Sequence, residues 1–207
     1  MPEQQRAKHV RKGLYLEYVT ISYNVLEGLV AVIAGYMSGS TALIGFGIDS
    51  AIEVTSGASL VWRLHSDAQP SRREKAERDS LRIVGVSFIL LAIYVAADAA
   101  VSLVTSEPPE ESWAGIVLAL FSIAVMPLLA KAKRRIAAQI GSSALTADAK
   151  QTELCTYLSV ILLAGLLLNA LFGWGWADPV AALIMVPIIA KEGIDALRGK
   201  TCCGSCH

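Results

Sequence analysis

The run Ser38-Gly-Ser-Thr-Ala-Leu-Ile-Gly-Phe-Gly-Ile-Asp-Ser-Ala-Ile-Glu53 places two carboxylates, Asp49 and Glu53, inside a long apolar stretch. A spacing of four residues puts both side chains on one face of a helix, one turn apart. Because a carboxylate in hydrocarbon costs a few kcal/mol, such a pair inside a membrane marks a functional site. Two oxygen ligands that face the same way suit a divalent cation.

The composition indicates a membrane protein. The chain has 207 residues, of which 54% are apolar and 17% are charged, whereas a soluble domain carries about 25% charge. Uncharged runs cover 113–130 and 154–177, and 83–104 is interrupted only by Asp98. Each run reaches the length of about 18 residues that a helix needs to cross the hydrocarbon core. We therefore expect an all-α polytopic membrane protein, and the net charge of zero gives no electrostatic case for a nucleic-acid partner.

The number of spans depends on one segment. Residues 28–48 carry no charge and could form a single span. The centre of this segment, Gly35-Tyr-Met-Ser-Gly-Ser-Thr41, is rich in residues that favour turns. The alternative is a tight hairpin, with one helix near 14–36 and the next near 40–63.

The distribution of basic residues favours the hairpin. All lysines and arginines except Lys150 fall into four clusters: 6–12, 63–82, 131–135 and 191–200. With a hairpin, every cluster lies on one side of the membrane, as the positive-inside rule expects. We predict six transmembrane helices with both termini cytoplasmic, the remaining spans being near 82–105, 113–131, 143–171 and 177–195.

The predicted organisation has three parts. Residues 1–13 form a basic cytoplasmic N-terminus, 14–197 a six-helix transmembrane domain, and 198–207 a cytoplasmic tail rich in Cys and His. The residues after the last helix are too few for an independent fold.

Two motifs resemble the cation diffusion facilitator (cation efflux) family. The second helix begins Ser38-Gly-Ser-Thr-Ala-Leu, and the fifth begins Ser142-Ser-Ala-Leu-Thr-Ala-Asp-Ala-Lys-Gln-Thr-Glu-Leu-Cys-Thr-Tyr-Leu-Ser159. Family members carry Ser-Gly-Ser-x-Ala-Leu followed by His/Asp-Ser-x-x-Asp, and a fifth helix like Ala-Leu-x-Ala-Asp-Ala-x-His-x-x-x-Asp. Asp178-Pro179 matches the frequent start of their sixth helix. The resemblance covers nearly the whole chain. It implies efflux of metal cations by a member with the transmembrane domain only, expected to lack the family's cytoplasmic C-terminal domain.

The resemblance also implies a ligand set. It places Asp49 and Glu53 in the metal positions of helix two, and Gln151 and Cys155 in those of helix five. At about 1.5 Å rise per residue, Asp49 and Gln151 both lie near the midplane of the membrane. Gln151 and Cys155 depart from the family's usual His and Asp. Gln151 could instead form a hydrogen bond between helices, and Cys155 could be a small buried apolar side chain.

These ligands indicate the class of the transported ion. Thiolate favours soft or borderline metals, so the transported ion is expected to be Zn or another such divalent metal (Cd, Fe, Co or Hg). Magnesium and calcium prefer sites made only of oxygen ligands. We predict no resident cofactor.

Further polar residues are candidates for a supporting role, as neighbours of the ligands or as proton carriers: Asn24, Glu27, Asp148 and Ser159. Because Gln151 cannot titrate, coupled protons must use Glu27, Asp49, Glu53 or Cys155. Asp98 is assigned either a structural hydrogen bond or a role in transport.

Two other groups of polar residues lie away from the candidate site. Lys150 and Glu153 point elsewhere and are expected to form a local pair. In the tail, Cys202, Cys203, Cys206 and His207 suit capture or delivery of a soft metal.

The sequence therefore predicts a metal/proton antiporter that exports a divalent transition metal by alternating access around one midplane site. The expected setting is a bacterial plasma membrane, and the partners are the lipid bilayer, the cation and a second copy bound through transmembrane helices. Enzymatic activity has no support, because the sequence contains no evident nucleophile–base pair or phosphate loop. Two alternatives remain: a membrane protein that binds or senses metal without transporting it, and a modulatory subunit of another transporter.

Overall fold

The protein is an all-α helical bundle. The computed structural model describes residues 3–38, 41–105, 113–172 and 176–199. These form six α-helices: α1 (Glu3–Ser38), α2 (Thr41–His65), α3 (Pro70–Thr105), α4 (Trp113–Ile140), α5 (Ser143–Phe172) and α6 (Ala177–Leu197). A short 3₁₀ helix, η1 (Ser66–Ala68), joins α2 to α3. Within the described residues, α1, α3 and α4 each contain a segment long and apolar enough to cross a membrane. The prediction of an all-α membrane protein is confirmed, and the count of six spans stays a prediction.

The segment 28–48 forms a helical hairpin and not one helix. α1 ends at Ser38 and α2 begins at Thr41. The two helices approach closely at paired glycines, since a Cβ on Gly28 would lie 3.3 Å from the carbonyl oxygen of Gly47, and one on Gly47 would lie 3.1 Å from that of Gly28. Small residues of this kind let helices pack backbone to backbone in lipid. The hairpin prediction is confirmed.

Three helices extend well beyond the predicted spans. α1 begins at Glu3, α3 begins at Pro70, and α4 continues to Ile140. The charged segments at these ends continue the helices because water can solvate one face of each. The uncharged runs in the sequence predict only the part of each helix that crosses the hydrocarbon core, and not its charged extension into water.

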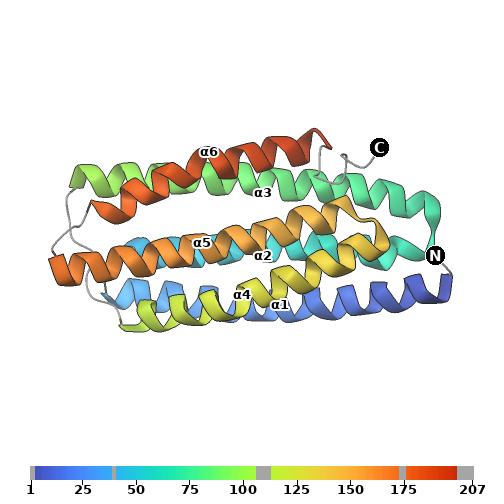
Figure 1. Ribbon diagram of the computed structural model, residues 1–207, viewed down its shortest axis with the longest axis horizontal. Coiled ribbons are helices and arrows are strands. Elements are labelled where there is room, and N and C mark those ends of the chain that lie inside the picture. The colour runs from blue at the N-terminus through green and yellow to red at the C-terminus, as the bar shows by residue number, and fades with distance from the viewer. Residues whose placement is uncertain (1–2, 39–40, 106–112, 173–175, 200–207) are drawn as a thin grey trace.

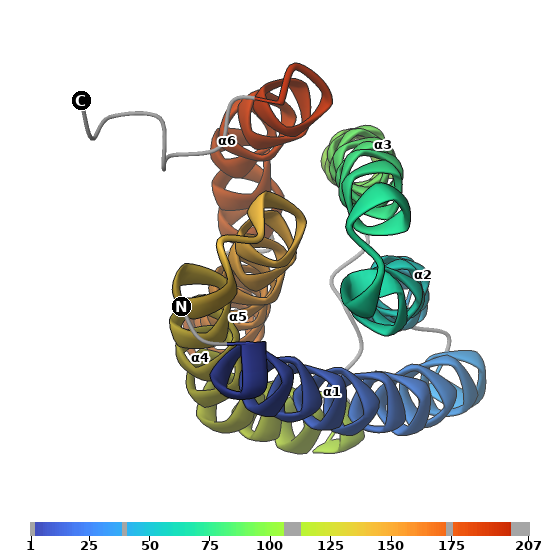
Figure 2. The same cartoon turned by 90° about the vertical axis from the view of Figure 1, so that its right-hand side faces the viewer.

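The helices run alternately up and down (Figure 1). α1 begins and α6 ends on the same side of the bundle, and all four basic clusters lie there; we call this side the basic end. α1 packs against α4, α3 against α6, and α2 contacts α5 in the centre (Figure 2). Gly85 of α3 and Gly193 of α6 face each other, because a Cβ on either would lie 3.1 Å from the carbonyl oxygen of the other.

The outer surface of the bundle is apolar and its interior holds polar groups. Leu26, Leu29, Ile93 and Ile184 are each more than half exposed. Twenty polar or charged side chains are buried among the described residues, including carboxylates of α1, α2 and α5. This distribution suits a bundle whose outer surface faces lipid tails and whose buried polar side chains serve a function in the interior.

An ion-pair cluster holds the helices together at the basic end. Arg6 of α1 donates two hydrogen bonds to Asp67 of η1, at 2.8 and 2.9 Å. Arg63 of α2 donates to Asp67 at 2.8 Å and also pairs with Glu77 of α3. Glu77 accepts a hydrogen bond of 2.7 Å from the backbone N–H of Ala144, which caps the start of α5. Four helices and the 3₁₀ turn are therefore joined through two carboxylates.

Asp67 makes this cluster sensitive to acid. Burial raises the pKa of Asp67, but the hydrogen bonds and charges of Arg6 and Arg63 outweigh this effect and hold the pKa below its usual value of 3.8. A carboxyl whose pKa is lowered by folding stabilises the fold above the unfolded pKa and loses this contribution as the pH falls through the folded pKa.

We expect Asp67→Asn to lower the free energy of unfolding at pH 7 by about 1–3 kcal/mol, because it breaks charge-assisted hydrogen bonds. Thermal unfolding in detergent should show the difference from wild type shrinking below about pH 4. Asp79→Asn, at the same end of α3, is the control and should change little. A difference that stays constant down to pH 3 would contradict the assigned role.

Candidate metal site

Two carboxylates of α2 are buried without enough hydrogen-bond partners. Asp49 and Glu53 lie on successive turns, and each side chain is only 4% exposed. Asn24 of α1 donates a hydrogen bond of 2.7 Å to Oε2 of Glu53. Three of their carboxylate oxygens have no hydrogen-bond partner among the described residues: both oxygens of Asp49, and Oε1 of Glu53. Buried polar atoms are rarely left in this state, so these oxygens are suitably placed to accept a cation.

The predicted ligands of α5 lie in the same interior. Gln151 and Cys155 are one turn apart and each is 1% exposed. The Cys155 thiol lies beside the Asp49 carboxylate. Neither amide atom of Gln151 has a hydrogen-bond partner among the described residues. The structure therefore brings Asp49 and Cys155 together and leaves the Gln151 amide available.

The four side chains do not form a closed cage. Within the described residues, no three Asp, Glu, His or Cys side chains are close enough together to enclose a metal ion. The hard oxygens, the amide and the thiol are chemically suited to a borderline divalent metal. The ligand assignment stays a prediction, and binding would require the side chains to converge or water to complete the coordination.

Glu27 is held by two hydroxyls. Tyr23 donates to its Oε1 and Ser50 donates to its Oε2, both at 3.1 Å. Ser50 adjoins Asp49 in the chain, so Glu27 of α1 contacts the same part of α2 as the candidate site. The helical spacing of four between Tyr23 and Glu27 could have revealed the first partner, whereas Ser50 is identified only by the packing of α1 on α2.

Ser159 is not directed at the carboxylates. Its hydroxyl donates a hydrogen bond of 2.9 Å to the carbonyl oxygen of Cys155, one turn earlier in α5. This bond can orient the helix turn that carries the thiol, and it leaves the supporting role predicted for Ser159 untested.

Toward the basic end, a buried lysine joins two carboxylates. Nζ of Lys133 in α4 lies 2.6 Å from Asp148 of α5 and 3.1 Å from Glu17 of α1. Ser56 of α2 also donates to Asp148, at 2.8 Å. Gly57 makes room for this arrangement, because a Cβ there would lie 3.3 Å from Oε2 of Glu17. We refer to Glu17, Lys133 and Asp148 as the buried triad; it connects α1, α4 and α5, and Ser56 adds α2.

The charge pattern places the cluster 131–135 on the same side as the other basic residues, and the structure agrees (Figure 1). The pattern does not indicate which of these residues point into the bundle. Lys131, Arg134 and Arg135 are exposed, but Lys133 is 1% exposed and points into the bundle. No local pattern distinguishes Lys133 from its neighbours, because only the packing of α4 reveals the two carboxylates that it meets.

The expected local pair of Lys150 and Glu153 is wrong. Lys150 pairs with Glu192 of α6, with a distance of 2.5 Å between Nζ and Oε2, and Glu153 pairs with Arg134 of α4. Each side chain faces a different neighbouring helix, and the ion pairs between helices replace the pair within one helix.

Away from the basic end, Asp49 borders a small cavity of about 80 Å³. Tyr94 and Asp98 of α3 also line this cavity. The Tyr94 hydroxyl lies directly over Gly45, where a Cβ would be only 1.6 Å away. Asp98 therefore shares a cavity with Asp49, and both roles considered for it remain open. The candidate site has the buried triad on one side and a cavity on the other.

The predicted tail ligands, Cys202, Cys203, Cys206 and His207, lie outside the described residues.

Comparisons with known proteins match most of the chain. The family model described as the cation efflux transmembrane domain matches residues 18–200. An uncharacterized transporter of Methanocaldococcus jannaschii is 27% identical over 91% of this chain and 67% of its own length. One of Synechocystis is 27% identical over 71% of this chain and 49% of its own. One of Bacillus subtilis is 24% identical over 94% of this chain and 69% of its own.

The triad gives a stability prediction. Lys133→Met removes the cation and leaves two buried carboxylates facing each other, so we expect a loss of about 3–5 kcal/mol. Thermal unfolding in detergent measures this. Lys131→Met, which changes an exposed lysine two residues away, should shift stability by less than about 0.5 kcal/mol.

Adding Glu17→Gln and Asp148→Asn to Lys133→Met should recover most of the loss, because no charge is then left unpaired. Equal stability of Lys133→Met and Lys131→Met would show that the triad does not stabilise the bundle.

Proposed function

The chain belongs to the cation efflux family, and on that premise we propose that it exchanges a divalent transition-metal cation for protons by alternating access around Asp49 and Glu53. Membership in the family and the transporter names of its relatives support cation transport by an integral membrane protein, and not an enzyme. The metal, the coupling to protons and the ligands are the proposed part.

The observation that carries the proposal is the set of unpartnered oxygens on Asp49 and Glu53. Both carboxylates are almost fully buried in a bundle whose outer surface is apolar. Together they have one hydrogen-bond donor, from Asn24, among the described residues. Burying charge without a partner is costly, and a cation passing through the bundle would supply the missing partner.

The donors favour a metal of intermediate softness. Carboxylate oxygens from α2 and a thiol from α5 combine hard and soft ligands at one place. We propose Zn as the principal substrate, with Cd, Fe, Co and Hg as candidates. Cys155 is the residue expected to move the preference toward the softer ions.

The asymmetry around the site supports alternating access. The cavity that Asp49 borders lies between the site and the end opposite the basic end, whereas the buried triad lies between the site and the basic end. In the proposed cycle, the contacts of Lys133 with Glu17 and Asp148 separate when the site opens toward the basic end. Water entering there would solvate all three charges.

Coupling to protons follows from competition for the same atoms. A metal ion binds the deprotonated forms of carboxylates and thiols. Protons that leave Asp49, Glu53, Glu27 or Cys155 when metal binds would return when it departs. The Gln151 amide neither gains nor loses a proton during this exchange.

The proposed setting is a bacterial plasma membrane with the basic end in the cytoplasm. The positive-inside rule supports this orientation. We propose a homodimer formed through transmembrane helices, and we propose that Cys202, Cys203, Cys206 and His207 capture metal on the cytoplasmic side.

Metal uptake into proteoliposomes tests the proposal directly. We expect purified protein to carry Zn into the vesicles in exchange for protons that leave them. A metal-sensitive dye and an internal pH dye should report these opposite movements. Asp49→Asn should lower both signals at least about tenfold, because it removes a ligand and a titratable group. Glu153→Gln changes a partly exposed carboxylate of α5 that pairs with Arg134; it is the control and should keep both signals.

Two outcomes would overturn parts of the proposal. Zn binding without flux in the wild-type protein would favour a metal-binding protein or a modulatory subunit. Full flux in Asp49→Asn would remove the site assignment while leaving transport intact.

The role of Cys155 is tested by metal competition. In Cys155→Asp we expect the ratio of Cd to Co transport to fall by roughly tenfold, because an oxygen donor replaces a soft sulfur donor. Cys155→Ser, which keeps the size of the side chain, should lower the ratio in the same direction. An unchanged ratio in both variants would show that the thiol is not a ligand.

A further inference from the structure

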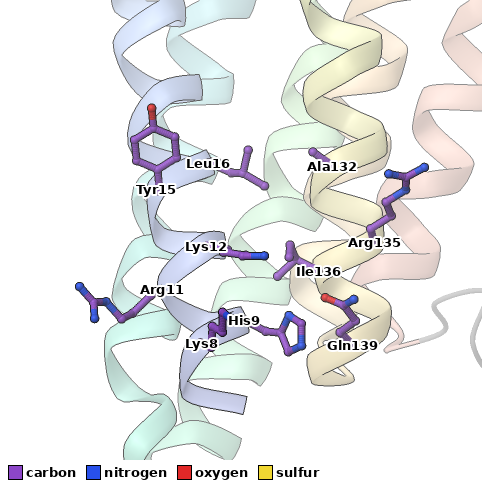
Figure 3. Close-up of a pocket in the computed structure, with 10 residues that line it drawn as sticks. All are labelled: Lys8, His9, Arg11, Lys12, Tyr15, Leu16, Ala132, Arg135, Ile136 and Gln139. Carbon is purple, nitrogen blue, oxygen red and sulfur yellow. The ribbon is translucent and has the colours of Figure 1, made fainter. Parts of the chain in front are cut away.

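A groove lined by cations opens between two helices at the basic end (Figure 3). It lies between the first part of α1 and the last part of α4, and its volume is about 600 Å³. Lys8, Arg11, Lys12 and Arg135 line it, together with His9 and the apolar side chains of Leu16, Ala132 and Ile136. We call it the basic groove. Lys12 and His9 point from α1 toward α4, while in this view Arg11 extends from the outer side of α1 and Arg135 from the outer side of α4 (Figure 3).

The cations of the basic groove differ from the other basic residues nearby. Arg6, Arg63, Lys133 and Arg134 each form an ion pair with a carboxylate. Within the described residues, no ion pair involves any of the four cations that line the groove, Lys8, Arg11, Lys12 and Arg135. None of the ten residues that line it is acidic. The groove therefore concentrates positive charge without a counterion from the described protein.

The groove also has an apolar wall at the depth of the lipid headgroups. The uncharged run 113–130 of α4 ends immediately before Lys131, and Ala132 and Ile136 follow on the next turns. On α1, Tyr15 is 70% exposed and lines the groove, as tyrosines do at membrane interfaces. A ligand with both a negative headgroup and a hydrocarbon tail complements this combination, whereas a free anion leaves the apolar wall unused.

We propose that the basic groove binds an anionic phospholipid of the adjacent leaflet. Its phosphate lies among Lys8, Lys12 and Arg135, and one acyl chain runs along Leu16 and Ile136. Nδ1 of His9 is buried without a hydrogen-bond partner among the described residues, and it is available to the headgroup. Basic pockets between helices at this level are suited to such headgroups.

The position of the groove connects it to the interior of the bundle. Leu16 and Ala132 line the groove, and the residues that follow them in the chain are Glu17 and Lys133 of the buried triad. A lipid that bridges α1 and α4 here holds together the two helices that the ion pair of Glu17 and Lys133 also joins. The lipid site goes beyond the proposed transport function and does not depend on it.

Lipid retention in native mass spectrometry tests the proposal. Purified protein in detergent receives equal amounts of phosphatidylglycerol and phosphatidylcholine, and we expect the anionic lipid to remain bound preferentially. Lys12→Gln with Arg135→Gln should weaken its retention at least about tenfold. Arg72→Gln with Lys75→Gln removes two exposed charges from α3 at the same end and should keep the retention of wild type.

Matched variants distinguish a lipid site in the groove from misfolding and from a general loss of positive charge. Lys12→Arg with Arg135→Lys keeps the charge and should keep the lipid, and thermal unfolding should show that every variant is folded. Equal retention of both lipids, or equal loss in the α3 control, would overturn the proposal. Displacement of the lipid by an equal concentration of inorganic phosphate would show a phosphate site instead. Loss of a dimer in the groove variant with unchanged lipid would show an interface between two copies.

Discussion

Carboxylates inside a bundle that faces lipid must find their partners within the bundle, and this constraint organises the interior of the protein. Glu17 and Asp148 share Lys133, and Ser56 adds a hydroxyl to Asp148. Glu53 has one donor from α1, and Asp49 has none among the described residues. Because each partner comes from a different helix, satisfying these groups also sets how α1, α2, α4 and α5 pack against each other.

The balance of charge changes along the axis of the bundle. At the basic end, arginines and carboxylates are balanced: Arg6 and Arg63 pair with Asp67 and Glu77. One level deeper, a single lysine serves two carboxylates, and at the level of Asp49 and Glu53 no described cation is paired with either. In the proposed cycle, a metal cation that reaches this level replaces protons on carboxylates that no described cation pairs with. Under the proposed function, this gradient favours a cation over an anion at the level of Asp49 and Glu53.

The hairpin was predictable from its local turn residues. The placement of the basic clusters at one end of the bundle was predictable because charged side chains must reach water. The sequence predicted the buried faces of α2 and α5 because a spacing of four residues fixes which side chains share a helix face. It could not assign Lys133, which stands among exposed basic residues and is distinguished only by its contacts with α1 and α5. The error over Lys150 and Glu153 has the same origin, since their partners lie on α6 and α4.

The contacts that join the helices are of two kinds, and they differ in what water does to them. Gly28 with Gly47 and Gly85 with Gly193 form dry backbone contacts that join α1 to α2 and α3 to α6. Such contacts have no alternative partner in water and favour movement of each pair as a unit. The triad that ties α1 to α4 and α5 can exchange its ion pairs for water at modest cost, because hydration compensates separated charges. In the proposed cycle the bundle therefore opens toward the basic end along the ionic contacts and not along the glycine contacts.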